Sequence, residues 1–358
     1  MRRRILLGVA AACAARGIGA TRIAPAFPGE QWDRHPDPAG VGFTAERLQT
    51  LRDFVAKLDT TAVQIVVGGR IVFDYGDTAY ASYLYSARKS VLAMLYGRHV
   101  QNGTIRLSDT LANLGMDDVA GLSELEKSAT VEHLLTQRSG VYHPASNTGD
   151  DTAFAPPRGS VTPGTFHLYN NWDFNAAGGV FELTTGIDIY DAFAADIAGP
   201  IGLQDFDRKR QIKTGDTDKS RYLAYHLHLS TRDMARLGLL MLRGGEWAGR
   251  RILPVGWSER IARLVTHHED LIPDRRRQLG KGQRWGYGYM WWVWDPVDEP
   301  DPMRGAYEAR GLFGQRITVI PSRDMVIAHK VGRRYQVAAG QLRRVRSSQY
   351  AELVRLAL

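Results

Sequence analysis

The sequence predicts an α+β fold in which helices flank one antiparallel sheet and a mostly helical lobe is inserted between its strands. Two observations support this prediction. Strand-forming runs lie near both ends of the chain, and helical spacing of apolar residues dominates between them. Since every sheet face must be buried against another layer, the simplest assembly pairs both chain ends in a single sheet. With 358 residues, of which 44% are hydrophobic and 23% charged, the composition is that of a globular protein with a substantial core.

The first strands form a predicted hairpin that follows one helix. Apolar residues recur with helical spacing over Ala45–Leu58. The β-forming runs Ala62–Val67 and Arg70–Tyr75 come next, separated by Gly68-Gly69. Paired glycines are typical of a two-residue hairpin turn, so these runs are expected to pair with each other.

The middle of the chain predicts helices separated by capping residues, glycines and prolines. The predicted helices cover Ser86–Gln101, Ala129–Thr136, Asn171–Thr185, Ile189–Ile197 and a segment that begins after Ser230 and ends before Gly244. Residues 143–167 contain four prolines and predict a loop.

Strand character returns near the C-terminus, before a closing helix over Leu342–Leu358. The predicted strands are Tyr287–Trp294, Ala306–Gly311, Arg316–Ile320 and Met325–Lys330. We therefore expect a sheet lobe made of residues 27–85 and 276–358, a helical lobe made of residues 86–275, and a ligand site in the cleft between them.

Ser86 and Lys89 form the first candidate catalytic pair. On a helix, residues i and i+3 lie on one face, so the hydroxyl and the amine can meet. A serine hydroxyl becomes an effective nucleophile when a base takes its proton. A lysine amine can be that base if burial or a neighbouring cation lowers its pKa. Alone, this pair is at least as typical of an ordinary surface helix.

Two further motifs lie downstream. The phenol of Tyr169 can take a proton from serine and return it to a leaving group, and the amide of Asn171 can hold the lysine and a substrate carbonyl. Gly311, in a predicted strand, allows a substrate to approach the backbone. The N–H groups of Leu312 and Ser86 are then expected to form an oxyanion hole. Alone, Tyr169 and Asn171 are more typical of a buried tyrosine followed by a helix-capping asparagine. Alone, the segment at Gly311 is more typical of an ordinary β-turn.

The order of these motifs resembles that of serine β-lactamases, penicillin-binding proteins and their esterase relatives. Ser-x-x-Lys follows a hairpin, Tyr-x-Asn comes about 80 residues later, and the glycine-bearing strand lies about 140 residues further on. The chain is similar to the class C β-lactamase-related hydrolases, within them to the 6-aminohexanoate-dimer-hydrolase-like group, over about residues 27–335. The supporting segments are ATVEHLLTQRSGV (129–141), PGTFHLYNNWDFNAAGGVFE (163–182), STRDMARLGLLMLRGGEW (230–247), YGYMWWV (287–293) and ARGLFGQRITVIP (309–321).

This resemblance implies a β-lactamase/transpeptidase-like fold, a covalent acyl-enzyme, and no metal or other cofactor. It assigns Ser86 as the nucleophile, Lys89 as the base and Tyr169 as the second acid/base group. Asn171 would position them.

One departure from the family pattern bears on the substrate. Penicillin-recognising relatives carry Lys-Thr-Gly or His-x-Gly in the third motif, and the Lys helps to bind a substrate carboxylate. Ala309 occupies that first position here. Arg310 is cationic, but neighbouring strand residues point to opposite faces. We expect Arg310 and Gly311 to be substrate contacts, and a carboxylic ester or a less anionic amide to be preferred over β-lactams.

The expected function is thus that of an exported serine hydrolase acting on a small-molecule ester or amide. A β-lactamase or D-Ala-directed peptidase is one alternative. A catalytically silent protein that binds cell-wall peptides is the other, although the complete Ser-Lys-Tyr set argues against it.

The N-terminus predicts export. Met1–Arg4 is basic, Ile5–Ala15 has no charge, and small residues recur through Ala26, so residues 1–26 are expected to be a signal peptide and the protein to be periplasmic. An uncleaved tail on a cytoplasmic protein is the alternative. The apolar run is too short to span a bilayer. Removal of the segment would also remove Cys13, the only cysteine. Lipidation at Cys13 is poorly supported, because Ala10 stands where Leu or Val is usual.

The formal charge of +8 does not indicate nucleic-acid binding. Five of the positive charges are arginines within residues 1–26, and the remaining charges are mixed in sign. The run Arg275–Arg277 is predicted to be a solvated loop.

Several other polar or aromatic groups are weaker candidates. His226 with His228, and the segment His267–Asp270, lack the spacing of a familiar zinc site, so no metal site is predicted. The aromatic residues between Trp285 and Trp294 are expected in the core and the cleft wall. His143 and Trp172 lie near the catalytic motifs in sequence and are candidates for substrate binding.

Overall fold

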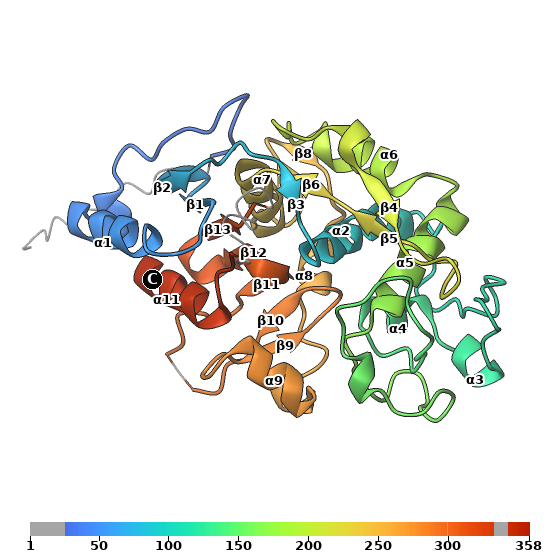
Figure 1. Ribbon diagram of the computed structural model, residues 1–358. Coiled ribbons are helices and arrows are strands. Elements are labelled where there is room, and N and C mark those ends of the chain that lie inside the picture. Colours follow the sequence, from blue (N-terminus) through green and yellow to red (C-terminus); the bar gives the residue numbers. More distant parts are fainter. Residues whose placement is uncertain (1–25, 299, 333–342) are drawn as a thin grey trace, which may run out of the picture.

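A seven-stranded antiparallel sheet forms the centre of the computed structural model, which describes residues 26–298, 300–332 and 343–358. The strand order is β2-β1-β13-β12-β11-β10-β9. The strands are β1 Ala62–Val67, β2 Arg70–Gly76, β9 Trp285–Tyr287, β10 Trp292–Trp294, β11 Tyr307–Gly311, β12 Gln315–Ile320 and β13 Met325–Lys330. Ala62 of β1 pairs with Lys330 of β13, so both chain ends build one sheet, as predicted (Figure 1).

Helices from the two chain ends cover one face of this sheet. α1 (Ala45–Val55) and α11 (Ser347–Ala357) pack against each other (Figure 1). Tyr350 of α11 shares a 2.6 Å hydrogen bond with Thr318 of β12. The C-terminal helix therefore closes the face of the sheet away from the inserted lobe.

Two other helices cover the opposite face. α2 (Ala87–Gln101) packs on β11 and β12, and α7 (Thr231–Leu242) packs on β1, β12 and β13. Gly238 allows close packing of α7, because a Cβ atom there would lie 2.5 Å from a methyl group of Val326. α7 thus lies on the sheet, although its sequence falls within the range 86–275.

The inserted segment contributes mostly short helices around one long one. They are α3 Glu124–Lys127, α4 Val131–Leu135, α5 Asn171–Thr185, α6 Ile189–Phe193, α8 Trp257–Ile261 and α9 Pro273–Leu279. Three two-stranded sheets join them: β3 Ser82–Tyr83 with β6 His228–Leu229, β4 Ile212–Thr214 with β5 Ala224–His226, and β7 Glu246–Trp247 with β8 Arg250–Arg251. Single turns of 3₁₀ or π helix cover Ala39–Val41, Thr152–Phe154, Ala194–Ala198, Arg208–Arg210, His268–Asp270, Leu312–Gly314 and Pro321–Arg323.

Two sequence predictions were wrong near the end of the inserted segment. Tyr287–Trp294 is not one strand: Tyr287 pairs with Trp292 across a tight turn in which Met290 has a φ of 59°. Every aromatic side chain of this turn is buried, so the sequence looks like one continuous buried strand. Arg275–Arg277 is helical, within α9, because Pro273 at the first position favours a helix start.

Other predicted helices end or begin within a few residues of their predicted limits. α1 stops at Val55, three residues early, and α4 starts at Val131 after the cap Thr130. α11 starts at Ser347. The predicted signal peptide covers residues 1–26, of which residues 1–25, including Cys13, lie outside the described part of the chain. Within the described residues, no helix is both long and apolar enough to span a bilayer.

Gly238→Ala is expected to destabilise the protein by about 1–3 kcal/mol, because the added methyl group overpacks the contact between α7 and the sheet. Urea unfolding would measure the change. The control is Gly29→Ala, where a Cβ atom would meet nothing within 4 Å. Equal stability of Gly238→Ala and wild type would contradict the close packing of α7.

Candidate active site

Ser86 lies where β3 leads into α2, as the N-cap residue of that helix. The first backbone N–H groups of α2 donate to carbonyls of the turn before the helix, from Ala87 to Leu84 at 3.2 Å and from Lys89 to Ser86 at 3.0 Å. The preceding Tyr85 has a φ of 52°, a left-handed conformation that costs about 1–3 kcal/mol for a residue other than glycine. Its ring packs edge-on against Phe313, with centroids 5.0 Å apart. Packing therefore holds a strained turn directly before Ser86.

Lys89 lies one helical turn after Ser86 and is 1% exposed. Its Nζ donates hydrogen bonds to the Tyr169 hydroxyl at 3.0 Å and to Asn171 Oδ1 at 2.8 Å. Burial lowers the pKa of Lys89 well below its ordinary value, and the adjacent Arg88 guanidinium lowers it further. The neutral amine is thus favoured relative to an exposed lysine.

Two neighbouring groups favour the charged form of Lys89 instead. The Asp150 carboxylate raises the pKa of Lys89, and the face of the Phe174 ring, 3.7 Å from Nζ, favours the cation. Burial is the largest of the effects on this pKa.

Tyr169 and Asn171 come from the start of α5. The backbone N–H of Asn171 donates to Asp150 Oδ2 at 2.9 Å, and its side-chain amide donates to the Thr148 carbonyl at 2.9 Å. The Tyr169 ring stacks on Trp292, with centroids 5.8 Å apart. These contacts fix both groups against Lys89. Burial raises the pKa of Tyr169, while the Arg275 cation and a hydrogen bond with the Ser86 side chain lower it.

Arg275 completes the surroundings of Tyr169. Its guanidinium carbon lies 4.4 Å from the centre of the Tyr169 ring. Two hydrogen bonds, at 2.8 and 2.7 Å, join Arg275 to both carboxylate oxygens of Asp151. The carboxylate is 2% exposed and the guanidinium 14% exposed, so this ion pair is buried.

The end of β11 closes the other side of the site. A Cβ atom on Gly311 would lie 2.2 Å from the Leu84 carbonyl oxygen, so only glycine fits at this position. β11 therefore lies against the chain two residues before Ser86. Leu312 follows directly, with a side chain that is 60% exposed.

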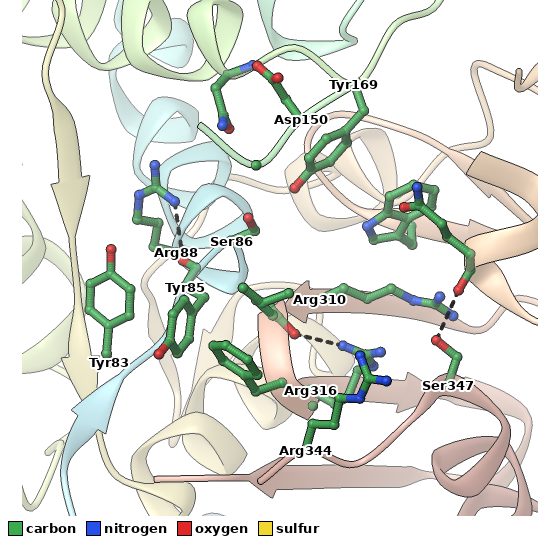
Figure 2. Close-up of a pocket in the computed structure, with 18 of the residues that line it drawn as sticks. Tyr83, Tyr85, Ser86, Arg88, Asp150, Tyr169, Arg310, Arg316, Arg344 and Ser347 are labelled. Atoms are coloured by element: carbon green, nitrogen blue, oxygen red, sulfur yellow. Dashed lines mark hydrogen bonds between the residues drawn. The ribbon is translucent and has the colours of Figure 1, made fainter. Parts of the chain in front are cut away.

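A cavity of about 710 Å³ opens over these groups (Figure 2). Its lining includes six of the predicted site residues: Ser86, Tyr169, Asn171, Arg310, Gly311 and Leu312. In Figure 2 the Tyr169 hydroxyl points toward Ser86, and Arg316, Arg344 and Ser347 lie on the side away from Tyr83. Lys89 lies beneath the cavity, where it touches Tyr169 and Asn171.

The beta-lactamase family model matches residues 49–349. This chain belongs to the beta-lactamase family. The family match confirms the resemblance that the sequence indicated.

Solved structures similar to this beta-lactamase-family chain share its fold at low sequence identity. A protein assigned as a 6-aminohexanoate-dimer hydrolase from Bacillus anthracis is 19% identical, with a TM-score of 0.60 over 85% of this chain and 80% of its own. A family VIII carboxylesterase is 16% identical, with a TM-score of 0.62 over 91% and 98%. A penicillin-binding protein from Bacillus halodurans is 15% identical, with a TM-score of 0.60 over 86% and 100%.

His143 and Trp172 do not line the catalytic cavity formed by the described residues, which corrects the prediction that they bind substrate. His143 Nε2 pairs with the Val119 carbonyl at 2.6 Å, and Trp172 Nε1 donates to Asp118 Oδ2 at 2.7 Å. Both side chains satisfy buried polar groups within the helical part of the beta-lactamase fold.

Arg310 lines the cavity, but its guanidinium is engaged elsewhere. Its Nε lies 2.5 Å from Glu308 Oε1, on the face of β11 opposite Ala309. The guanidinium carbon also lies 4.7 Å from the centre of the Trp285 ring. The cation thus does not occupy the place of the lysine found in penicillin-recognising relatives.

The histidines singled out in the sequence have other partners. His226 Nε2 pairs with Thr214 Oγ1 at 2.6 Å, and its other ring nitrogen contacts the Tyr83 hydroxyl. The backbone N–H of His268 donates to Asp295 Oδ2 at 2.8 Å. Among the described residues, no group of three or more His, Cys, Asp or Glu side chains is arranged to hold a metal ion.

Sequence reasoning missed Arg88, Asp150 and Arg275 as members of the site, and predicted Trp292 only as one of the aromatic residues of the core and the cleft wall. The signal for Arg88 was present, because it lies within the Ser-x-x-Lys motif. Arg275 and Trp292 come from α9 and β10, and no local pattern reveals that they meet at Tyr169. Their roles depend on tertiary packing.

Arg275→Met is expected to lower the free energy of unfolding by about 3 kcal/mol, since it leaves the Asp151 carboxylate buried without its cation. The Arg275→Met/Asp151→Asn double variant should recover part of that loss. Urea unfolding of both variants would measure this. Arg276→Met, which breaks the more exposed pair with Glu269, is the matched control. A loss no larger than that of the control would contradict the importance of the buried pair.

Proposed function

We propose that this chain is a serine hydrolase that cleaves a carboxylic ester or amide through an acyl-enzyme on Ser86. One observation carries the proposal: the buried Lys89 amine lies one turn from Ser86 and bonds to the Tyr169 hydroxyl and Asn171. These two hydrogen bonds use two N–H donors, the number that a neutral amine possesses. A neutral amine is a base that can activate serine.

In the first step, Ser86 Oγ attacks the substrate carbonyl carbon while its proton passes to Lys89, directly or through the Tyr169 hydroxyl. The pKa of Tyr169 is raised, so its phenol retains a proton and can pass one on. The carbonyl oxygen becomes an oxyanion, which the backbone N–H groups of Ser86 and Leu312 would stabilise.

In the second step, the tetrahedral intermediate collapses and the bond to the alcohol or amine breaks. The leaving group takes the proton from Tyr169, which is replenished from Lys89. Water then attacks the ester on Ser86 with the same base, which releases the carboxylic acid and restores the serine.

The residues of the third motif support an ester or a weakly anionic amide as substrate. Ala309 is fully buried and offers no cation at the third motif, and the guanidinium of Arg310 is paired with Glu308. A β-lactamase or D-Ala-directed peptidase is the alternative of the same chemistry, and family membership is the observation that favours it.

Ser86→Ala is expected to reduce hydrolysis of a short-chain nitrophenyl ester to below about one percent of wild type. Stopped-flow absorbance should show, for wild type, a burst of about one equivalent of nitrophenol, because acylation precedes slower deacylation. Circular dichroism would establish that the variant is folded.

Faster turnover of the chromogenic β-lactam nitrocefin than of the ester would favour the β-lactamase alternative. No turnover of either substrate would favour a silent peptide-binding protein.

The pH dependence tests the role of Lys89. If its neutral amine is the base, kcat/KM for an uncharged ester rises as pH increases through the pKa of Lys89. The Arg88 cation lowers that pKa, so Arg88→Met should raise it and move the midpoint of the profile to higher pH. Arg98→Met removes an exposed cation at the far end of α2 and should leave the midpoint in place. A midpoint unchanged in Arg88→Met would contradict Lys89 as the titrating base.

A further inference from the structure

A second cavity lies beside the catalytic one, between α11 and the β9, β10 and β11 end of the sheet. Its volume is about 160 Å³. Much of its wall is apolar or aromatic, formed by Trp285, Trp294, Met303, Tyr350, Val354 and Leu358. An apolar cavity of about 150 Å³ accommodates benzene, so this cavity has room for a ring or a chain of about six carbons.

One wall of this cavity carries an unbalanced buried charge. Glu308, which is 0% exposed, has its Oε1 2.5 Å from Arg310 Nε and 3.1 Å from Arg316 Nε. Its other oxygen accepts a hydrogen bond from Thr318. Burial lowers the pKa of Arg310 to about 10, so the guanidinium remains charged at neutral pH. Two cations thus face one carboxylate, leaving one positive charge in excess.

Neighbouring groups stabilise these cations without neutralising them. Arg316 Nη1 donates to the carbonyls of Gly311 at 3.0 Å and Gln315 at 3.1 Å. Arg310 lies against the Trp285 ring. Within the described part of the chain, neither Nε has a hydrogen-bond acceptor in suitable geometry. A buried charge is costly unless an opposite charge pairs with it, so this wall favours an anion.

The rest of the wall limits what that anion can be. Arg355 also lines the cavity, but it pairs with Glu352 at 2.6 Å and adds no net charge. A single excess charge matches a monoanion better than a phosphate dianion. The apolar wall then requires a hydrocarbon tail.

We propose that this cavity binds a short amphipathic carboxylate, a monocarboxylic acid whose tail is a benzene ring or a chain of about six carbons. The carboxylate pairs with Arg310 and Arg316, and the tail contacts Trp285, Trp294 and Met303. This binding goes beyond the proposed hydrolysis, since it requires no chemistry at Ser86.

The proposed ligand must be distinguished from one in the catalytic cavity, because Arg310, Arg316 and Ser347 line both cavities. Figure 2 shows these three residues at the catalytic cavity. Ala351 of α11 lines only the smaller one among the described residues. Ala351→Phe should fill that space and leave the catalytic cavity open. Ser348, exposed on the same helix and lining neither cavity, provides the matched control Ser348→Phe.

Isothermal titration of the full chain with sodium hexanoate and with its neutral analogue hexanamide tests the proposal. Wild type should bind hexanoate about tenfold or more tightly than hexanamide, because only the acid pairs with the excess cation. Ala351→Phe should weaken hexanoate binding about tenfold, while Ser348→Phe should bind as wild type does. Tryptophan fluorescence gives a second readout, since Trp285 and Trp294 line the cavity.

Equal affinity for hexanoate and hexanamide would overturn recognition of an anion. Undiminished binding by Ala351→Phe, or equal losses in both phenylalanine variants, would overturn the location. Arg310→Met should remove the preference for the acid while hexanamide still binds. If that variant does not fold, the comparison of hexanoate with hexanamide still tests recognition of the anion, and Ala351→Phe still tests the location. Calorimetry detects binding without turnover, so failure of the proposed hydrolysis would leave this test intact.

Discussion

Burial of the Lys89 amine is the interaction on which the rest of the site depends. Its Nζ is held by one phenol and one amide, both from the start of α5. A lysine in this position is stable only if the surrounding chain excludes water and tolerates a neutral amine. Asn171, the loop at Asp150 and the Tyr169 ring stacked on Trp292 meet that requirement together. Displacement of any of them would admit water and restore an ordinary lysine.

The helix that carries Ser86 and Lys89 is fixed along its length by buried polar contacts. Ser90 donates to the Met290 carbonyl at 2.6 Å, and Tyr96 donates to the Ala177 carbonyl at 2.6 Å. Trp257 of α8 donates to the Ala93 carbonyl at 2.9 Å. Each contact reaches a different part of the structure, so α2 is anchored to the turn between β9 and β10, to α5 and to α8. Rigid support of this kind preserves the geometry that the proposed proton transfer requires.

Much of the fold could be predicted from sequence because its elements have strong local signals. The structure has the local features that the sequence indicated: the hairpin at Gly68-Gly69, the cap at Ser230 and the helix over Asn171–Thr185. The motif residues could be predicted because their order is distinctive. What could not be predicted depends on tertiary contacts. Arg275 reaches Tyr169 only because α9 packs beside the catalytic cavity. The turn at Met290 lies within a run of buried aromatic residues, and such a run predicts one continuous strand.

Pairing of the two chain ends also has a consequence for the order of events during synthesis. β1 lies between β2 and β13, and Ala62 pairs with Lys330. While the chain emerges from the ribosome, β1 can pair with β2 alone, and the inserted helices are made before the remaining strands exist. The sheet is therefore completed only after the inserted segment and β13 have been made. Such long-range pairing slows folding and leaves strand edges exposed in the interval. A nascent chain of this topology requires protection from aggregation until its last strands arrive.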